Sequence, residues 1–258
     1  MPNRERLVIT VGLTLTGLGL TFFIADPATV WLLALVLVGT VCVGTDGIVR
    51  SHPKIHLHSL GYTLTFSILP ALLTLAAALF LRLIVYAGIH WLIGGLALTG
   101  FLLAAVIVGE YTTVDWRSRY YSLARLTLSV ACYIAAFTLY IVIYNQKVRS
   151  IQSATAVWLI SSLLALELFR ETEAEAARTW LYAAVVGLVV GEMTWGLNQW
   201  PISGPAGGAF LLLAFYVATG MVQNVFAGRL THRMLFEFGA VAAIGFAFLF
   251  FMSHFWVR

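Results

Sequence analysis

The chain has 258 residues, of which 61% are hydrophobic and 10% are charged, and its formal net charge is +4. Soluble proteins carry about one charged residue in four, so this composition excludes a soluble globular protein. The small positive charge bears on orientation in a membrane, and it gives no reason to expect a nucleic-acid partner.

Nine apolar runs are long enough, or nearly long enough, to cross a membrane as helices. They cover about residues 7–24, 29–48, 60–80, 89–109, 121–144, 152–169, 180–200, 206–226 and 235–255. The hydrophilic stretches between them are too short for a separate soluble domain. We therefore predict an all-α integral membrane protein, a polytopic bundle of about nine transmembrane helices that forms a single domain over residues 1–258.

The distribution of basic residues predicts the orientation of the chain. Cytoplasmic segments of membrane proteins carry an excess of lysine and arginine. With a cytoplasmic N-terminus, eleven of the fifteen basic residues lie in inner segments and four in outer segments. We predict a cytoplasmic N-terminus and an external C-terminus. The short loops and the absence of an organelle signal favour a multi-pass protein of a bacterial-type cytoplasmic membrane.

The seventh apolar run, Thr179–Pro201, carries an acid far from its basic end. Glu192 lies thirteen residues after Thr179, which is roughly 20 Å along a helix in a hydrocarbon core about 30 Å thick. Carboxyl groups at such depth are costly and usually face other helices or a water-filled cavity. Glu192 is therefore a candidate functional residue.

Two interpretations of Glu192 remain open. In the first, Glu192, Trp195, Asn198 and Gln199 line a buried polar pocket that takes up a proton or a small ligand. In the second, Glu192 is neutral and hydrogen-bonded to a neighbouring helix, which it helps to hold. A GxxxG pattern at residues 187–191 predicts that another helix packs closely against this run.

A second group of charged residues stands at the predicted inner ends of several runs. Arginine side chains in such a group can clamp a phosphate or a lipid head group, and a carboxylate could act as a base. Alternatively, these residues only mark the boundary with water, as charged residues do at most helix ends. The group comprises Asp46, Glu110, Asp115, Arg117, Arg119, Glu167 and Arg170.

Three histidines, His52, His56 and His58, follow the second run in an HxxxHxH pattern. That spacing suits a metal only on a regular helix, and Pro53 disfavours such a helix. We expect no metal site there and interpret the segment as a loop near lipid head groups. The nature of any cofactor is not indicated by the sequence.

Three functions of different class follow from these patterns. A non-catalytic membrane module, either a scaffold or an accessory subunit, ranks first because recognisable catalytic motifs are absent. A small-molecule or proton-coupled transporter that uses Glu192 ranks second, and an enzyme that modifies lipids with Glu110 or Asp115 as base ranks third. The expected partners are membrane lipids, and either a partner membrane protein or further copies of this chain.

Overall fold

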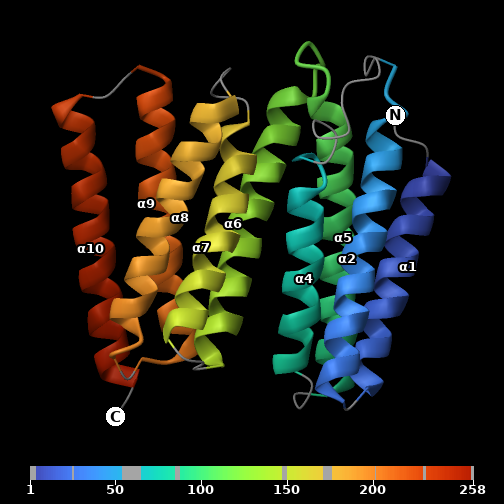
Figure 1. The fold of residues 1–258 in the computed structure, drawn as a ribbon, viewed down its shortest axis with the longest axis horizontal. Coiled ribbons are helices and arrows are strands. Elements are labelled where there is room, and N and C mark those ends of the chain that lie inside the picture. Colours follow the sequence, from blue (N-terminus) through green and yellow to red (C-terminus); the bar gives the residue numbers. More distant parts are fainter. Residues whose placement is uncertain are drawn as a thin grey trace. The chain divides into compact units, whose positions relative to one another are not determined.

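We describe the chain from a computed structural model, which covers residues 4–24, 26–53, 65–84, 88–146, 150–170, 176–200, 202–228 and 231–256. Within these ranges the regular elements are all α-helices (Figure 1). They are α1 (Arg4–Phe23), α2 (Pro27–Val49), α4 (Ile68–Leu83), α5 (Ile89–Thr113), α6 (Tyr121–Asn145), α7 (Ser150–Phe169), α8 (Ala176–Leu197), α9 (Gly204–Phe226) and α10 (His232–Trp256).

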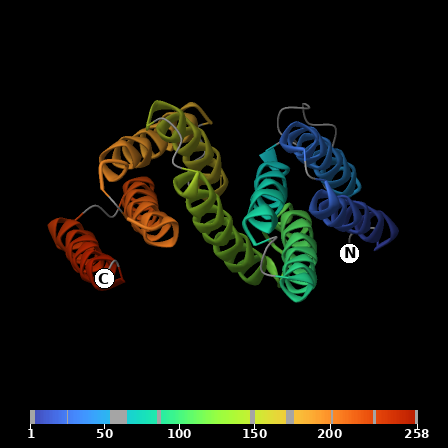
Figure 2. The same cartoon turned by 90° about the horizontal axis from the view of Figure 1, so that it is seen from below.

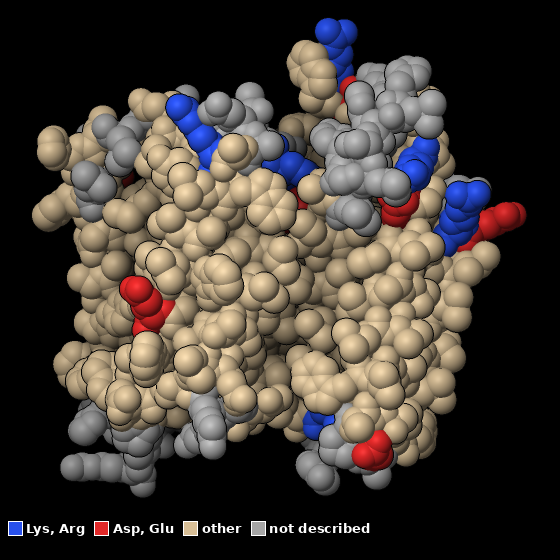
Figure 3. All heavy atoms as spheres, viewed as in Figure 1, with Lys and Arg blue, Asp and Glu red and all other residues tan. Residues whose placement is uncertain are grey.

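Seven of these helices are long and apolar enough to cross a membrane. Two shorter apolar stretches, Ile68–Leu83 and Phe236–Phe248, account for the other predicted spans. The predicted all-α membrane bundle of about nine helices is thus confirmed. Figure 3 shows that most charged side chains lie near the helix ends, with a broad uncharged surface between them that carries one acidic side chain.

Local sequence explains where α2 and α4 begin. Asp26 caps α2 by accepting a 2.8 Å hydrogen bond from the Thr29 backbone N–H. The Thr29 side chain also donates to the Asp26 carboxylate, and these hydrogen bonds lower the pKa of Asp26. Pro70 lies in the first turn of α4, where its missing N–H costs nothing. We predicted the third span from about residue 60; α4 begins at Ile68, and residues 54–64 lie outside the described part of the chain.

The chain divides into two compact units, Met1–Ala135 and Ala136–Arg258, and the boundary falls within α6. In unit 1, α1, α2, α4 and α5 form a four-helix bundle in which each helix packs mainly against two neighbours, in the cyclic order α1, α2, α4, α5 (Figure 2). Leu18 and Leu37 pack in the core of this bundle, and a side chain at Gly17 would overlap Leu37. Small residues thus let α1 and α2 approach closely.

In unit 2, α7 and α8 form the most extensive helix–helix contact. Gly187 and Gly191 of α8 face α7, and a Cβ atom at Gly191 would lie 3.0 Å from the Ala154 carbonyl oxygen and 3.2 Å from Trp158 Cβ. Trp158 also donates a 3.3 Å hydrogen bond from Nε1 to the carbonyl of Ala184. The close packing predicted from the GxxxG pattern is therefore present, and α7 is the partner helix.

The rest of unit 2 is joined by buried tyrosines and a glycine-rich start of α9. Tyr140 of α6 and Ser161 of α7 share a buried hydrogen bond of 2.6 Å. Tyr144 donates a 2.7 Å hydrogen bond to the carbonyl of Leu197 at the end of α8. A side chain at Gly207 would overlap the Tyr144 ring, so glycine is required where α9 crosses α6.

Candidate functional site

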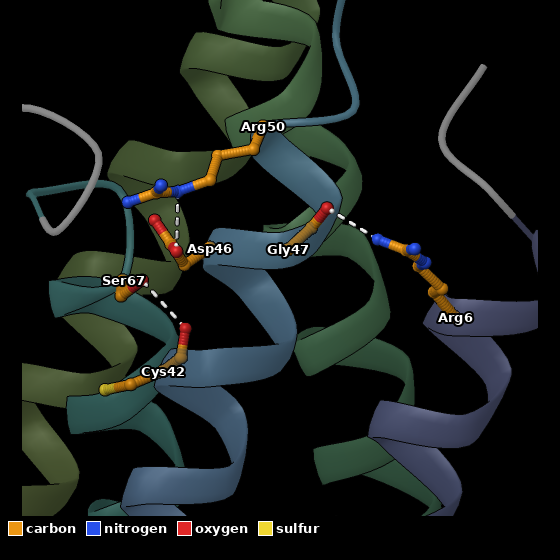
Figure 4. Close-up of polar contacts among 6 residues, drawn as sticks. All are labelled: Arg6, Cys42, Asp46, Gly47, Arg50 and Ser67. Atoms are coloured by element: carbon orange, nitrogen blue, oxygen red, sulfur yellow. Dashed lines mark hydrogen bonds and ion pairs between the residues drawn. The ribbon is translucent and has the colours of Figure 1, made fainter. Parts of the chain in front are cut away.

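The inner ends of the unit 1 helices, meaning the ends predicted to be cytoplasmic, are held by polar contacts to α2 (Figure 4). Arg6 of α1 donates a 3.2 Å hydrogen bond to the carbonyl of Gly47. Arg50 forms an ion pair of 2.8 Å with Asp46 one turn earlier. Ser67, which precedes α4, donates a 3.3 Å hydrogen bond to the carbonyl of Cys42. These contacts fix the inner end of α2 against both neighbours.

The inner end of α5 leads into a structured turn over residues 114–120. Glu110 is completely buried within α5, and Tyr111 is 9% exposed. Asp115 accepts a 3.1 Å hydrogen bond from the Arg117 backbone N–H, an arrangement that favours a turn. The Arg117 guanidinium stacks over the Trp116 ring at 4.8 Å, so its charge is directed to the surface.

A cavity of about 530 Å³ lies between α5, this turn and α6. Its volume is within the range of roughly 300–1,000 Å³ that is typical of small-molecule sites. The described residues that line it are His52, Ala105, Val108, Gly109, Tyr111, Thr112, Asp115, Ser118, Tyr120, Leu123, Ala124 and Thr127.

The lining of this cavity changes from polar to apolar with depth. His52, Asp115, Ser118 and Tyr120 stand at the inner end, because they belong to the segments that follow α2 and connect α5 to α6. Ala105 lies seven residues before Thr112, roughly 10 Å deeper along α5. Two hydroxyl groups of the lining donate hydrogen bonds to carbonyls of their own helices, Thr112 to Val108 at 2.7 Å and Thr127 to Leu123 at 2.9 Å. The site is therefore amphipathic.

His52 joins this cavity to the end of α2. Its ring meets Tyr111 edge to face, with ring centroids 4.8 Å apart, and its backbone N–H donates a 3.0 Å hydrogen bond to the carbonyl of Val49. The other two histidines of the HxxxHxH pattern lie outside the described residues, so the structure does not test the pattern as a whole.

The members of the predicted inner cluster have different local environments within their own units. Asp46 is paired with Arg50, Glu110 is buried in α5, and Asp115 lines the cavity, while Arg117 and Arg119 are exposed. Glu167 and Arg170 belong to unit 2, where Glu167 is 2% exposed and pairs with Arg170 at 3.1 Å. Within unit 1, Asp115 is the member of the cluster that contributes to the cavity lining.

The residues predicted around Glu192 lie at the outer end of α8 and just after it. Glu192, Trp195 and Gln199 are exposed on the surface of the chain. Asn198 is half-buried and donates a 2.8 Å hydrogen bond to Ser153 of α7. α8 packs against α7 with its glycine face, and Glu192 lies on another side of the helix, so both interpretations of Glu192 stay predictions.

Comparison with known protein families places the chain. A family model described as "Protein of unknown function (DUF5656)" matches residues 8–252. The chain belongs to this family. The DUF5656 match covers α2 to α9 completely and most of α1 and α10, so it extends over both units. Searches of curated proteins and of solved structures found no match.

Sequence reasoning missed most of the cavity in this DUF5656 chain. Tyr111 and Tyr120 lie between the fourth and fifth apolar runs and were not among the predicted site residues, and Val108 and Leu123 were only parts of those runs. The concentration of tyrosine, threonine and serine between Tyr111 and Tyr121 was the available signal. That signal does not say which side chains face one another across α5 and α6.

Proposed function

We propose that this chain is a non-catalytic membrane module that holds one lipid molecule of the inner leaflet. The cavity between α5, residues 114–120 and α6 carries this proposal, because its polar end and its apolar depth match the two parts of a lipid. The polar end of the cavity lies at the ends of long apolar helices, which supports a position near lipid head groups.

The chemistry of the lining favours a head group that donates hydrogen bonds. None of the described residues that line the cavity is lysine or arginine, whereas Asp115 supplies a carboxylate and Tyr111 and Tyr120 supply aromatic rings. Carboxylates and aromatic faces both attract ammonium groups. A lipid with a primary amine or several hydroxyl groups suits this end, and its acyl chain would follow Ala105 and Val108.

Native mass spectrometry of the protein purified in a mild detergent tests lipid retention. We expect one lipid per chain and its recovery with an unchanged chemical structure. Val108→Trp should displace this lipid by filling the apolar part of the cavity, since Val108 lines it. Val130→Trp is the matched control, because Val130 is 49% exposed on α6 and is not among the lining residues. Equal retention by both variants would contradict the proposal.

Asp115→Asn should change head-group selectivity without removing the site. The asparagine can still accept the Arg117 backbone N–H, so the turn is expected to remain, but the charge-assisted bond to a head group is lost. We expect about tenfold weaker binding of an amine-bearing lipid, corresponding to roughly 1.4 kcal/mol. Competition between lipids in nanodiscs measures this change. A lipid without amine or hydroxyl donors serves as the control and should bind both proteins equally.

A further inference from the structure

The exposed face of α8 has the spacing of a helix–helix seam. Leu181, Val185, Leu188, Glu192 and Trp195 follow one another at intervals of four, three, four and three residues, and all are exposed. Four of them are large apolar residues, between 46% and 62% exposed. An alternation of four and three places residues on one stripe that can interdigitate with a second helix at a shallow crossing angle.

The opposite face of α8 is already occupied within the chain. Ala183, Val186 and Val190 are at most 1% exposed, and Gly187 and Gly191 contact α7. One face of α8 therefore packs against the other helices of unit 2, and the other face has no neighbouring helix within the described part of that unit. We call the second face, formed by Leu181, Val185, Leu188, Glu192 and Trp195, the α8 seam.

Glu192 shows that hydrocarbon alone is a poor environment for the α8 seam. Among the residues that the structure describes, Glu192 has no hydrogen-bond or ion-pair partner. The nearest basic residue on the helix, Arg178, precedes it by fourteen positions, roughly 21 Å. A carboxyl group exposed to lipid chains at this depth is costly, and association with another helix relieves that cost.

We propose that the α8 seam is the contact between two copies of this chain, with Glu192 of one copy hydrogen-bonded to Glu192 of the other. Copies inserted with the same topology present α8 in parallel orientation. In a parallel symmetric pair each seam residue meets its own counterpart, so the two carboxyl groups lie in one layer. Two carboxyl groups at one site can share a proton, which gives a donor and an acceptor without any basic residue.

Open space beside Glu192 suits this close approach. Gly196, one turn after Glu192, is exposed, and a Cβ atom there would have no atom within 4 Å. The backbone of a second helix can therefore come near the carboxyl pair. A different membrane protein with a lysine or arginine in its helix is the alternative occupant, and the experiment below separates the two.

The first test measures self-association of donor- and acceptor-labelled protein in liposomes by energy transfer at several protein-to-lipid ratios. We expect a concentration-dependent dimer. Glu192→Leu should weaken the dimer about tenfold or more, because the interhelical hydrogen bonds are lost. Glu192→Gln should retain association within about threefold, because paired amides also donate and accept. Thermal unfolding of the separated monomers should be similar for all three proteins, since Glu192 is exposed.

The second test maps the seam by disulfide formation in membranes, in a background with Cys42 and Cys132 replaced by alanine. Leu188→Cys should cross-link between copies, because facing seam positions bring Cα atoms within the 4.4–6.8 Å that a disulfide needs. Trp180→Cys is the matched control, because Trp180 is 56% exposed on the same helix but lies off the seam. It should cross-link at least tenfold more slowly.

Three outcomes would overturn the proposal. The first is a chain that remains monomeric at every protein-to-lipid ratio. The second is equal dimerisation by wild type and Glu192→Leu, or equal cross-linking at Leu188→Cys and Trp180→Cys. The third is co-purification of a different protein through a basic transmembrane helix that is lost in Glu192→Gln, since an amide cannot replace the charge of a carboxylate in an ion pair.

Discussion

Replacing Gly187 by alanine is expected to destabilise unit 2 by roughly 1–3 kcal/mol, because the added methyl group has no room between α7 and α8. A Cβ atom at this position would overlap Ser162 Oγ and would lie 2.5 Å from the Trp158 carbonyl oxygen. Ser162 Oγ can rotate away, but the carbonyl belongs to the α7 backbone, so the helices must separate. Thermal unfolding in detergent should show a midpoint several degrees lower.

Gly239→Ala is the matched control for this prediction. Gly239 lies in the interior of α10, and a Cβ atom there would meet nothing within 4 Å. Alanine should therefore leave stability unchanged or raise it by about 0.5 kcal/mol, because it reduces the backbone freedom of the unfolded chain. If Gly187→Ala and Gly239→Ala unfold at the same temperature, then α7 and α8 are not packed as closely as described.

The fold was predictable because its main determinants are local in the sequence. Apolar runs of membrane length identify helices without knowledge of their neighbours, since a lipid environment requires every backbone group to be bonded within its own segment. The GxxxG at Gly187 and Gly191 likewise predicted a close helix contact. The GxxxG pattern did not identify α7 as the partner helix. The partner depends on how the helices rotate and pack against one another, and a pattern within one helix does not contain that information.

The candidate site was less predictable for the same physical reason. Depth in the membrane can be counted along one helix, so Glu192 was correctly recognised as an acid far from the helix start. The direction in which the Glu192 side chain points depends on which face of α8 packs against the other helices of unit 2. The face with Gly187 and Gly191 packs against α7. The cavity beside Asp115 depends on how α5, a turn and α6 approach one another, and hydropathy carries no information about that approach.

The inner cluster illustrates a further limit of sequence reasoning. Charged residues at successive inner helix ends share a depth, and we therefore treated them as one group. Depth alone does not determine their contacts: Arg117 stacks on Trp116, whereas Glu167 pairs with a residue three positions along its own helix. Equal depth is a requirement for a joint site but does not establish one.

Arg170→Ala is expected to destabilise the protein by roughly 2–4 kcal/mol, because it removes the guanidinium that pairs with a buried carboxylate. The two side chains are 16% and 1% exposed, and Arg170 Nη1 lies 3.1 Å from Glu167 Oε2. Water therefore screens this pair poorly. Chemical or thermal unfolding in detergent micelles, compared with wild type, measures the loss.

The ion pair of Arg50 and Asp46 provides the control, because its side chains are 42% and 23% exposed at a similar separation of 2.8 Å. Arg50→Ala should cost less than about 1 kcal/mol, as is usual for solvent-exposed pairs. Adding Glu167→Gln to Arg170→Ala should recover part of the stability, since a neutral amide needs no counter-charge. Equal losses for Arg50→Ala and Arg170→Ala, or a double variant less stable than Arg170→Ala, would show that burial of the carboxylate does not govern stability here.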